Sequence, residues 1–307
     1  MSKKDTYKNK LIHGDTLSVL KEMPDGIIDL GITSPPYNKQ EKNNGGLISK
    51  VIYADYKDKL PEKEYQKRQV ETLDEIYRVT KDGGSFFYNH KTRWVNGEMF
   101  HPMDWLRKTK WVVKQEIIWD RTIAGNIRGW RFWQVEERIY WLYKPIKGNK
   151  KGSELDSKDA KMTSIWRSVP ENHNAHPAPF PVWLPARIIL SLLSHKRKAL
   201  VLDPYVGSGT TALASKLLGF DYVGIDISKE YLKYAEDRLK NCRNEMEKVE
   251  KEKELHIVKK TFKQRKEEGL YKPKVRTKQA HIFQETIIRE QGKDSICLLY
   301  TSPSPRD

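Results

Sequence analysis

The chain is 307 residues long and strongly basic, with 57 lysines and arginines against 41 aspartates and glutamates and a formal net charge of +16. Its length suits one large α/β domain with appendages or two small domains, and its charge is typical of a protein that binds a polyanion, although a solvated basic surface would look the same. Its only cysteines, Cys242 and Cys297, exclude a disulfide framework and a cysteine-rich zinc site. No apolar run approaches the ~18 residues of a membrane span and no signal-peptide core follows Met1, so we expect a cytoplasmic protein with no membrane partner.

Up to about residue 241, apolar runs alternate with amphipathic segments, a pattern typical of βα units around a largely parallel sheet. In chain order, the expected elements are a strand over 11–13, a helix over 16–23, a strand over 27–33, a helix over 61–80, a strand over 85–88, strands over 111–119 and 138–143, a helix over 182–194, a strand over 199–202, a helix over 210–218, a strand over 222–225 and a helix from 228. The strands over 111–119 and 138–143 are rich in β-formers and predict an antiparallel pair. The polar segment 38–60 is too long for a simple connector, so we expect a functional loop there.

A glycine-rich turn follows the apolar strand over 199–202. It fits the G-x-G-x-x-A fingerprint of nucleotide-binding turns, and Asp226 follows it at the spacing of a ribose acceptor. The fingerprint alone would fit a nicotinamide or flavin enzyme equally well. Asp203 favours S-adenosylmethionine, because its carboxylate would repel a pyrophosphate but attract ammonium and sulfonium charges. The cofactor-binding residues expected here are Asp203, Tyr205, Gly207, Ser208, Gly209, Thr210, Thr211 and Asp226.

A second motif, Ser34-Pro35-Pro36-Tyr37, follows the strand expected over 27–33. Two consecutive prolines fix φ and carry no N–H group, so the carbonyls of Ser34 and Pro35 are held outward. In an arbitrary protein such a pair marks a tight turn. Beside a methyl donor it suits a planar base, because Ser34 and the Pro35 carbonyl can accept hydrogen bonds from an exocyclic amine while Tyr37 stacks on the ring. We therefore expect Ser34, Pro35, Pro36 and Tyr37 to be catalytic, in a direct in-line methyl transfer without a covalent enzyme intermediate.

In this order, the two motifs resemble those of the β group of amino DNA methyltransferases, the N4-cytosine/N6-adenine DNA methylase family, over about residues 11–241. The resemblance implies an α/β fold of the Rossmann-like, S-adenosylmethionine-dependent type: a mostly parallel seven-stranded sheet with a terminal antiparallel hairpin and helices on both faces. It also implies that Asp15 contacts the adenine of the cofactor, that Asp226 binds its ribose, and that His176 and Phe180 flank its methionine end. The two motif loops must then open into one shared cleft.

The resemblance further implies double-stranded DNA as the substrate, with the target base flipped out of the duplex. The loop between the two antiparallel strands interleaves cations with aromatic rings, which can stack on an extruded base, although packing within the hairpin would explain the rings as well. The expected DNA-binding residues are Arg128, Trp130, Arg131 and Trp133.

Combined with composition, the resemblance predicts three parts of the chain. They are a methyltransferase catalytic domain over 1–241, a basic helical extension over 242–295 and a disordered tail over 296–307. The segment 144–175 is a small candidate target-recognition insertion, which is short for reading a multi-base site. The basic extension is either a solvated helix or an arm that follows phosphates. We also expect a restriction–modification system, in which a companion restriction endonuclease forms no stable complex with this chain.

Ser34 in place of an aspartate resembles the N4-cytosine members of the family, so we expect cytosine N4 as the target. Adenine N6 is the alternative, because both bases present a similar amine. Two other classes of protein remain open. A dinucleotide-dependent oxidoreductase would use the glycine turn but would leave the Ser-Pro-Pro-Tyr motif unexplained, and a non-catalytic DNA-binding module would account for the charge alone.

Overall fold

The computed structural model describes residues 4–38, 60–122, 129–149, 152, 154–158, 162–168, 180–196, 198–257, 262–269, 287–290 and 293–296. The chain forms two compact units, residues 1–258 and 259–307. The second unit contains helix α8 (Phe262–Glu267) and an antiparallel pair of strands, β11 (Ile287–Glu290) and β12 (Lys293–Ile296). The first unit contains the main sheet, and both predicted motifs belong to it.

An eight-stranded sheet runs through the first unit in the order β1-β10-β9-β2-β3-β7-β6-β8. The strands from β1 to β3 in this order are parallel, β7 is antiparallel to both of its neighbours, and β8 is parallel to β6. The central strand β2 is buried at every position, as expected for a strand covered on both faces. The strands are β1 (Lys10–His13), β2 (Ile28–Thr33), β3 (Thr80–His90), β6 (Val112–Asp120), β7 (Glu136–Tyr143), β8 (Ile165–Arg167), β9 (Leu200–Asp203) and β10 (Asp221–Asp226).

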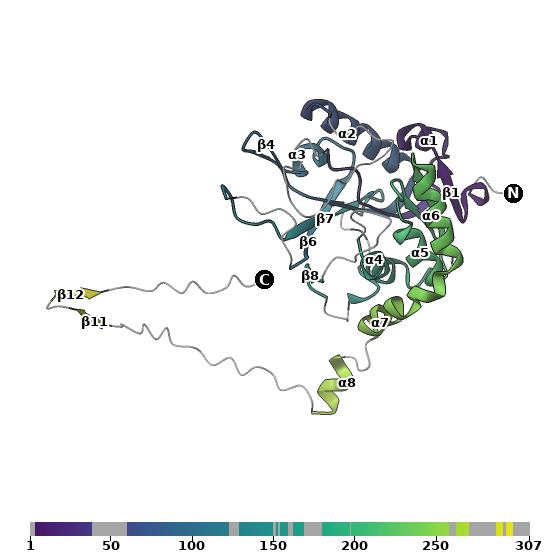
Figure 1. Ribbon diagram of the computed structural model, residues 1–307. Coiled ribbons are helices and arrows are strands. Elements are labelled where there is room, and N and C mark those ends of the chain that lie inside the picture. Colours follow the sequence, from purple (N-terminus) through teal and green to yellow (C-terminus); the bar gives the residue numbers. More distant parts are fainter. Residues whose placement is uncertain are drawn as a thin grey trace. The chain divides into compact units, whose positions relative to one another are not determined.

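Helices cover both faces of the sheet (Figure 1). One face carries α1 (Thr16–Glu22), α2 (Glu62–Val79) and α3 (Met103–Leu106); the other carries α4 (Trp183–Leu193), α5 (Thr210–Leu217), α6 (Lys229–Lys240) and α7 (Met246–His256). Strand side chains alternate between the two resulting cores, so that Leu200 and Leu202 pack on the first face and Val201 packs on the second. Among the described residues, no helix is both long enough and apolar enough to cross a bilayer.

The predicted fold class is confirmed, and the expected seven strands are corrected to eight. The additional strand is β8, which lies inside the predicted insertion and pairs with β6, so the antiparallel pair of β6 and β7 is not the edge of the sheet. Within β8, Trp166 is buried while its neighbours on both sides are exposed. Three residues with one buried position are too few to produce a recognisable strand pattern.

A two-stranded hairpin follows β3 where the sequence analysis expected none. It consists of β4 (Arg93–Val95) and β5 (Glu98–Phe100), which pair antiparallel across Asn96 and Gly97. Both turn residues have positive φ, 51° and 84°, as a type I′ hairpin turn requires. The Asn-Gly dipeptide was therefore a readable signal of this hairpin.

Helix α7 lies within the predicted basic extension, and it packs against α4. Val249 is fully buried in the core on this face of the sheet. Arg187 of α4 donates two hydrogen bonds, of 2.7 and 3.0 Å, to the buried carboxylate of Glu252. The first half of the charged segment is thus attached to the sheet-containing unit by both apolar and ionic contacts.

Candidate active site

The two predicted motifs lie side by side at the carboxyl ends of two neighbouring parallel strands of the sheet. The Ser-Pro-Pro-Tyr loop follows β2 and the glycine turn follows β9, and these two strands are paired in parallel. Thr33 Oγ1, at the end of β2, donates a hydrogen bond of 2.6 Å to Asp203 Oδ1, at the end of β9. Thr211 Oγ1 donates a longer one, of 3.4 Å, to the carbonyl of Ile32. Ligands of open α/β sheets bind at the carboxyl ends of the strands, so both motifs are placed to act on one molecule.

Asp203 is a buried carboxylate, with 2% of its surface exposed. Burial raises the pKa of Asp203 to about 6, while hydrogen bonds from Thr33 and the Tyr205 N–H, together with the nearby Thr211 hydroxyl, oppose that rise. In the described part of the chain, its hydrogen-bond donors are hydroxyl and backbone groups rather than a lysine or an arginine. A buried anion held in this way favours the arrival of a positively charged ligand.

The glycine turn has the backbone conformation that its sequence predicts. Gly207 and Gly209 have φ values of 47° and 79°, in the left-handed region that favours glycine. The Gly207 N–H donates a hydrogen bond of 2.8 Å to Asp226 Oδ2, while Oδ1 of Asp226 accepts one of 2.9 Å from the Ser228 N–H. Burial raises the pKa of Asp226, and these backbone donors oppose the rise. Asp226 therefore ties the turn to the end of β10, next to the position expected for a ribose.

Arg238 of α6 is hydrogen-bonded to the same glycine turn. Its guanidinium donates hydrogen bonds of 3.2 Å to the Ser208 carbonyl and 2.9 Å to Thr210 Oγ1. Glu245 binds the other side of the guanidinium through two further hydrogen bonds of 2.6 and 2.8 Å. Ser208 and Thr210 are both buried. Their contacts to Arg238 give these two predicted cofactor-binding residues a role in fixing the turn.

Asp15 lies beside these elements, at the start of α1. Its carboxylate caps the helix by accepting a hydrogen bond of 3.1 Å from the Ser18 N–H, and it forms an ion pair of 2.5 Å with Arg68. The next residue, Thr16, donates a hydrogen bond of 2.6 Å to the Pro204 carbonyl. The predicted adenine-contacting segment is therefore joined directly to the segment that follows β9.

The predicted methionine-end segment is described only in part. Phe180 is buried in the apolar core that includes residues of the sheet and of α4. His176 lies outside the described residues. Phe180 therefore has a packing role in this core. Its contact with the methionine end of the cofactor stays a prediction.

The Ser-Pro-Pro-Tyr loop is tied to β3 and β7 by a polar network. Ser34 Oγ and the Tyr37 hydroxyl lie 2.6 Å apart. The Tyr37 hydroxyl also lies 3.0 Å from Glu137 Oε2, and Asn89 Nδ2 donates hydrogen bonds of 3.1 Å to Tyr37 and 2.7 Å to Glu137. Two expected catalytic residues thus share hydrogen bonds with two residues that the motif does not contain.

His90 and Tyr65 support the loop from the other side. The Tyr65 hydroxyl lies 2.9 Å from the Pro36 carbonyl and 2.7 Å from His90 Nε2, so these two acceptors share its proton. Burial, together with nearby Arg93, lowers the pKa of His90 to about 3, which keeps the imidazole neutral. The Tyr37 ring lies against it, with 4.5 Å between ring centroids. The loop therefore packs against the uncharged rings of His90 and Tyr65.

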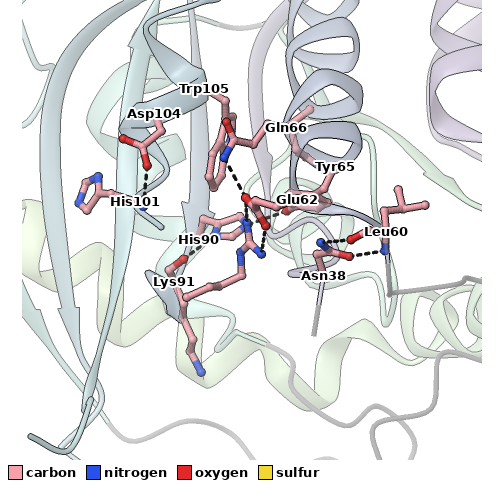
Figure 2. Close-up of polar contacts among 12 residues, drawn as sticks. Asn38, Leu60, Glu62, Tyr65, Gln66, His90, Lys91, His101, Asp104 and Trp105 are labelled. Atoms are coloured by element: carbon pink, nitrogen blue, oxygen red, sulfur yellow. Dashed lines mark hydrogen bonds and ion pairs between the residues drawn. The ribbon is translucent and has the colours of Figure 1, made fainter. Parts of the chain in front are cut away.

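The long loop after the motif is closed at its base. Asn38 Nδ2 donates a hydrogen bond of 2.9 Å to the Leu60 carbonyl, and the Leu60 N–H donates one of 2.7 Å to Asn38 Oδ1, as Figure 2 shows. The functional loop predicted over 38–60 otherwise lies outside the described residues. Its two ends are held together within one residue of Tyr37.

The predicted DNA-binding residues that the structure describes lie just before β7. Trp130 and Trp133 are 55% and 58% exposed, and Phe132 between them is 98% exposed. The Arg131 guanidinium lies 4.0 Å from the centroid of the Trp94 ring, which belongs to the β4–β5 hairpin. Arg128 lies outside the described residues. Exposure of three large rings argues against hairpin-core packing as the reason for their presence.

Sequence patterns did not predict three residues of the site, Asn89, Glu137 and Arg238. A signal existed for Asn89, because it follows the apolar run of the strand predicted over 85–88, and in the structure this strand pairs with the strand that carries the first motif. Glu137 is the second residue of an antiparallel strand, so its proximity to the Ser-Pro-Pro-Tyr loop depends on the pairing of β7 with β3. Arg238 is one of several charged residues on an amphipathic helix, and no local pattern distinguishes it from the others.

Comparison with known proteins agrees with the fold and the motifs. A family model described as DNA methylase matches residues 28–237. Type II methyltransferase M.BglII of Bacillus subtilis is 32% identical over 263 residues, which cover 75% of this chain and 68% of that protein. Among solved structures, PvuII DNA methyltransferase (cytosine-N4-specific) matches with a TM-score of 0.60 at 18% identity, covering 78% of this chain and 92% of that one. The complex of M1.HpyAVI with S-adenosylmethionine (SAM) matches with a TM-score of 0.53 at 23% identity, covering 75% of this chain and 98% of that one. The chain therefore belongs to the N6/N4 DNA methylase family.

Proposed function

We propose that this protein is a site-specific DNA methyltransferase, which transfers a methyl group from S-adenosylmethionine to the exocyclic amino group of a base flipped out of double-stranded DNA. The observation that carries the proposal is the hydrogen bond of 2.6 Å between Thr33 and Asp203. It joins the strand end that presents an amine-binding loop to the strand end that presents a cofactor-binding turn. The net charge of +16 is consistent with a DNA substrate.

S-adenosylmethionine, when bound, supplies an electrophilic methyl carbon. The buried Asp203 carboxylate would attract its cationic end, and Asp226, beside the glycine turn, would accept hydrogen bonds from its ribose. Ser34 Oγ and the Pro35 carbonyl would accept hydrogen bonds from the two hydrogens of the amine, which leaves the nitrogen lone pair directed at the methyl donor. The nitrogen–carbon bond would form as the sulfur–carbon bond breaks, the neutral thioether would leave, and the methylated nitrogen would release one proton to water. Positioning and electrostatics then account for the catalysis, with no covalent bond between enzyme and base.

Cytosine N4 is our proposed target atom. Its support is Ser34, a neutral hydroxyl where an aspartate is more usual in members that act on adenine. The likeness to the cytosine-N4-specific PvuII enzyme, at 18% identity, carries the fold only. Adenine N6 remains the second candidate, because its amine offers the same two hydrogens.

DNA from a host that expresses the protein is expected to contain N4-methylcytosine. Digestion to nucleosides followed by mass spectrometry would identify the modified base, with DNA from a host that carries Ser34→Ala as the control. Methylome sequencing of the same DNA would give the recognition site. Finding N6-methyladenine would overturn the choice of base but not the proposed reaction, whereas unmodified DNA would overturn both.

Replacing Trp130 with alanine is expected to weaken DNA binding about 5- to 150-fold, because stacking of one base on an aromatic ring contributes about 1–3 kcal/mol. Fluorescence anisotropy with a labelled duplex that contains the site measures this affinity. Leu255→Ala is a matched control, since Leu255 is a 56% exposed apolar residue on α7. An equal change in affinity in the two variants, or no change in Trp130→Ala, would contradict a contact between the Trp130 ring and DNA.

We further propose that the protein acts in a restriction–modification system. M.BglII bears the name type II methyltransferase. A companion endonuclease would recognise the same DNA sequence independently, without a stable complex with this chain. Resistance of the modified host DNA to digestion by such an endonuclease is the expected result.

A further inference from the structure

A buried glutamate at the start of β7 contacts the Ser-Pro-Pro-Tyr loop, and neither motif explains it. Glu137 is 6% exposed. Its Oε1 atom forms ion pairs of 3.1 Å with both Lys91 and Arg121. Its Oε2 atom faces the loop, where it accepts a hydrogen bond of 2.7 Å from Asn89 and lies 3.0 Å from the Tyr37 hydroxyl. One carboxylate oxygen is therefore neutralised by cations, while the other is available to orient the loop.

The Glu137 carboxylate determines the direction of the hydrogen bonds around it. A carboxylate only accepts, so its contact with Tyr37 uses the single hydroxyl proton of that tyrosine. Asn89 donates a second hydrogen bond, of 3.1 Å, to the same hydroxyl oxygen. The 2.6 Å contact between Ser34 and Tyr37 then requires Ser34 to be the donor. The Ser34 proton consequently points toward Tyr37. Ser34 Oγ also accepts a longer hydrogen bond, of 3.4 Å, from Asn89, which leaves its second lone pair for a further donor.

We infer that Glu137 is a positioning residue, which acts through Tyr37 to hold the Ser34 hydroxyl as a hydrogen-bond acceptor for the amino group of the target base. With the opposite direction, Tyr37 would donate to Ser34, and the Ser34 proton would face the hydrogens of the amine. Two donors would then oppose each other at the atom that must orient the substrate. The inference rests on the proposed function, because it assigns a cause to the acceptor role of Ser34.

The charge state of Glu137 fits this role. Burial alone would raise its pKa, but Lys91, Arg121 and the Asn89 hydrogen bond hold the pKa at about 2. The group therefore remains an acceptor throughout the working pH range, and it is too weak a base to remove a proton from the methylated amine.

The test is a double-mutant cycle on Glu137→Gln and Tyr37→Phe. The measured quantity is the first round of methyl transfer from radiolabelled S-adenosylmethionine to unmethylated bacteriophage genomic DNA, with enzyme in excess. Each single variant is expected to slow this step at least about tenfold, because both leave the Ser34 proton undirected. The double variant is expected to be no slower than the slower single variant, since both changes break the same chain of hydrogen bonds. The dissociation constant of the cofactor should stay within about twofold of wild type in all three.

Glu252→Gln is the matched control, because Glu252 is an equally buried glutamate bound by an arginine, but it lies on α7 and contacts α4. It is expected to lower the midpoint of urea unfolding while the rate of methyl transfer stays at the wild-type value. Glu137→Asp is a second variant that keeps the charge beside Lys91 and Arg121 but draws the carboxylate away from Tyr37. The Glu137→Asp protein should fold and still transfer the methyl group more slowly than wild type. The test therefore remains decisive if Glu137→Gln does not fold.

Three results would overturn the inference alone. They are a wild-type rate in Glu137→Gln or Glu137→Asp, a double variant whose loss is the product of the single losses, and a parallel loss of cofactor affinity, which would indicate a merely structural role. Absence of methyl transfer by the wild-type protein would instead overturn the proposed function, and this inference with it. The wild-type reaction therefore separates the two failures.

Discussion

Asp203→Asn is expected to weaken S-adenosylmethionine binding roughly 10- to 100-fold, which corresponds to about 1.4–2.7 kcal/mol. The physical reason is that asparagine keeps the shape and hydrogen-bonding capacity of the side chain but removes the buried charge that attracts a cationic cofactor. Isothermal titration calorimetry measures the affinity directly. In the cofactor-free protein, the free energy of unfolding at neutral pH is not expected to fall, because the same change removes a charge whose burial is unfavourable.

The affinity of the wild-type protein should also depend on pH through Asp203. Burial raises the pKa of Asp203 from 3.8 to about 6 in the folded protein. The contribution of Asp203 to the stability of the cofactor-free fold therefore increases as the pH falls from about 6 toward 3.8, since the folded state binds the extra proton. Cofactor binding has the opposite dependence and should weaken by up to about tenfold for each pH unit below about 6. Titrations between about pH 5 and 8 should show this loss in the wild type but not in Asp203→Asn.

Asp29→Asn is the control for the measurements of cofactor affinity and of unfolding free energy on Asp203→Asn. Asp29 is a buried aspartate at the opposite end of β2, where it binds Lys81 at 2.7 Å and Lys4 at 3.1 Å. Its replacement is expected to lower the free energy of unfolding by about 1–3 kcal/mol while the cofactor affinity stays within about twofold. Equal losses of affinity in the two variants would contradict the placement of the cofactor at Asp203. Tight binding of NAD by the wild type would favour an oxidoreductase instead.

The parts of the site that lie on continuous apolar strands could be predicted from the sequence. The runs that end at Thr33 and Asp203 are apolar and short, and each is followed by residues that stop a strand. The rule that parallel strands end at one edge then brings the two motifs together without any knowledge of side-chain contacts. The hydrogen bond between Thr33 and Asp203 is the local result of that rule.

The rest of the site depends on pairings that no local pattern encodes. Glu137 reaches the loop because β7 enters the sheet antiparallel to β3, with Arg138 opposite His90 and Ile139 opposite Asn89. A shift of this register by one residue would turn the carboxylate to the other face of the sheet. Arg238 reaches the glycine turn only because α6 packs beside α5. Such contacts are decided by tertiary packing, and the sequence shows only a charged residue in an element of the right type.

Gly209→Ala is expected to destabilise the protein by about 2–4 kcal/mol and to lower cofactor affinity by about tenfold or more. Gly209 has a φ of 79°, which costs an alanine about 1–2 kcal/mol. In addition, a Cβ atom at this position would lie 2.8 Å from the Cβ of Ala235 on α6, so that either the helix or the turn must move. Because Arg238 and Asp226 hold the turn on both sides, the displacement should reach the residues expected to bind the cofactor. Urea unfolding and titration calorimetry measure the two effects.

Gly219→Ala separates the cost of backbone conformation from the cost of the collision. Gly219 has the same φ of 79°, but no atom lies within 4 Å of the position its Cβ would take. Its replacement should therefore cost only about 1–2 kcal/mol and leave cofactor affinity unchanged. A loss in Gly209→Ala that is no larger than in Gly219→Ala would mean that α6 yields to the added methyl group. Close packing of α6 against Gly209 would then not be the constraint that fixes the glycine turn. The hydrogen bonds from Arg238 would have to account for the geometry of the turn instead.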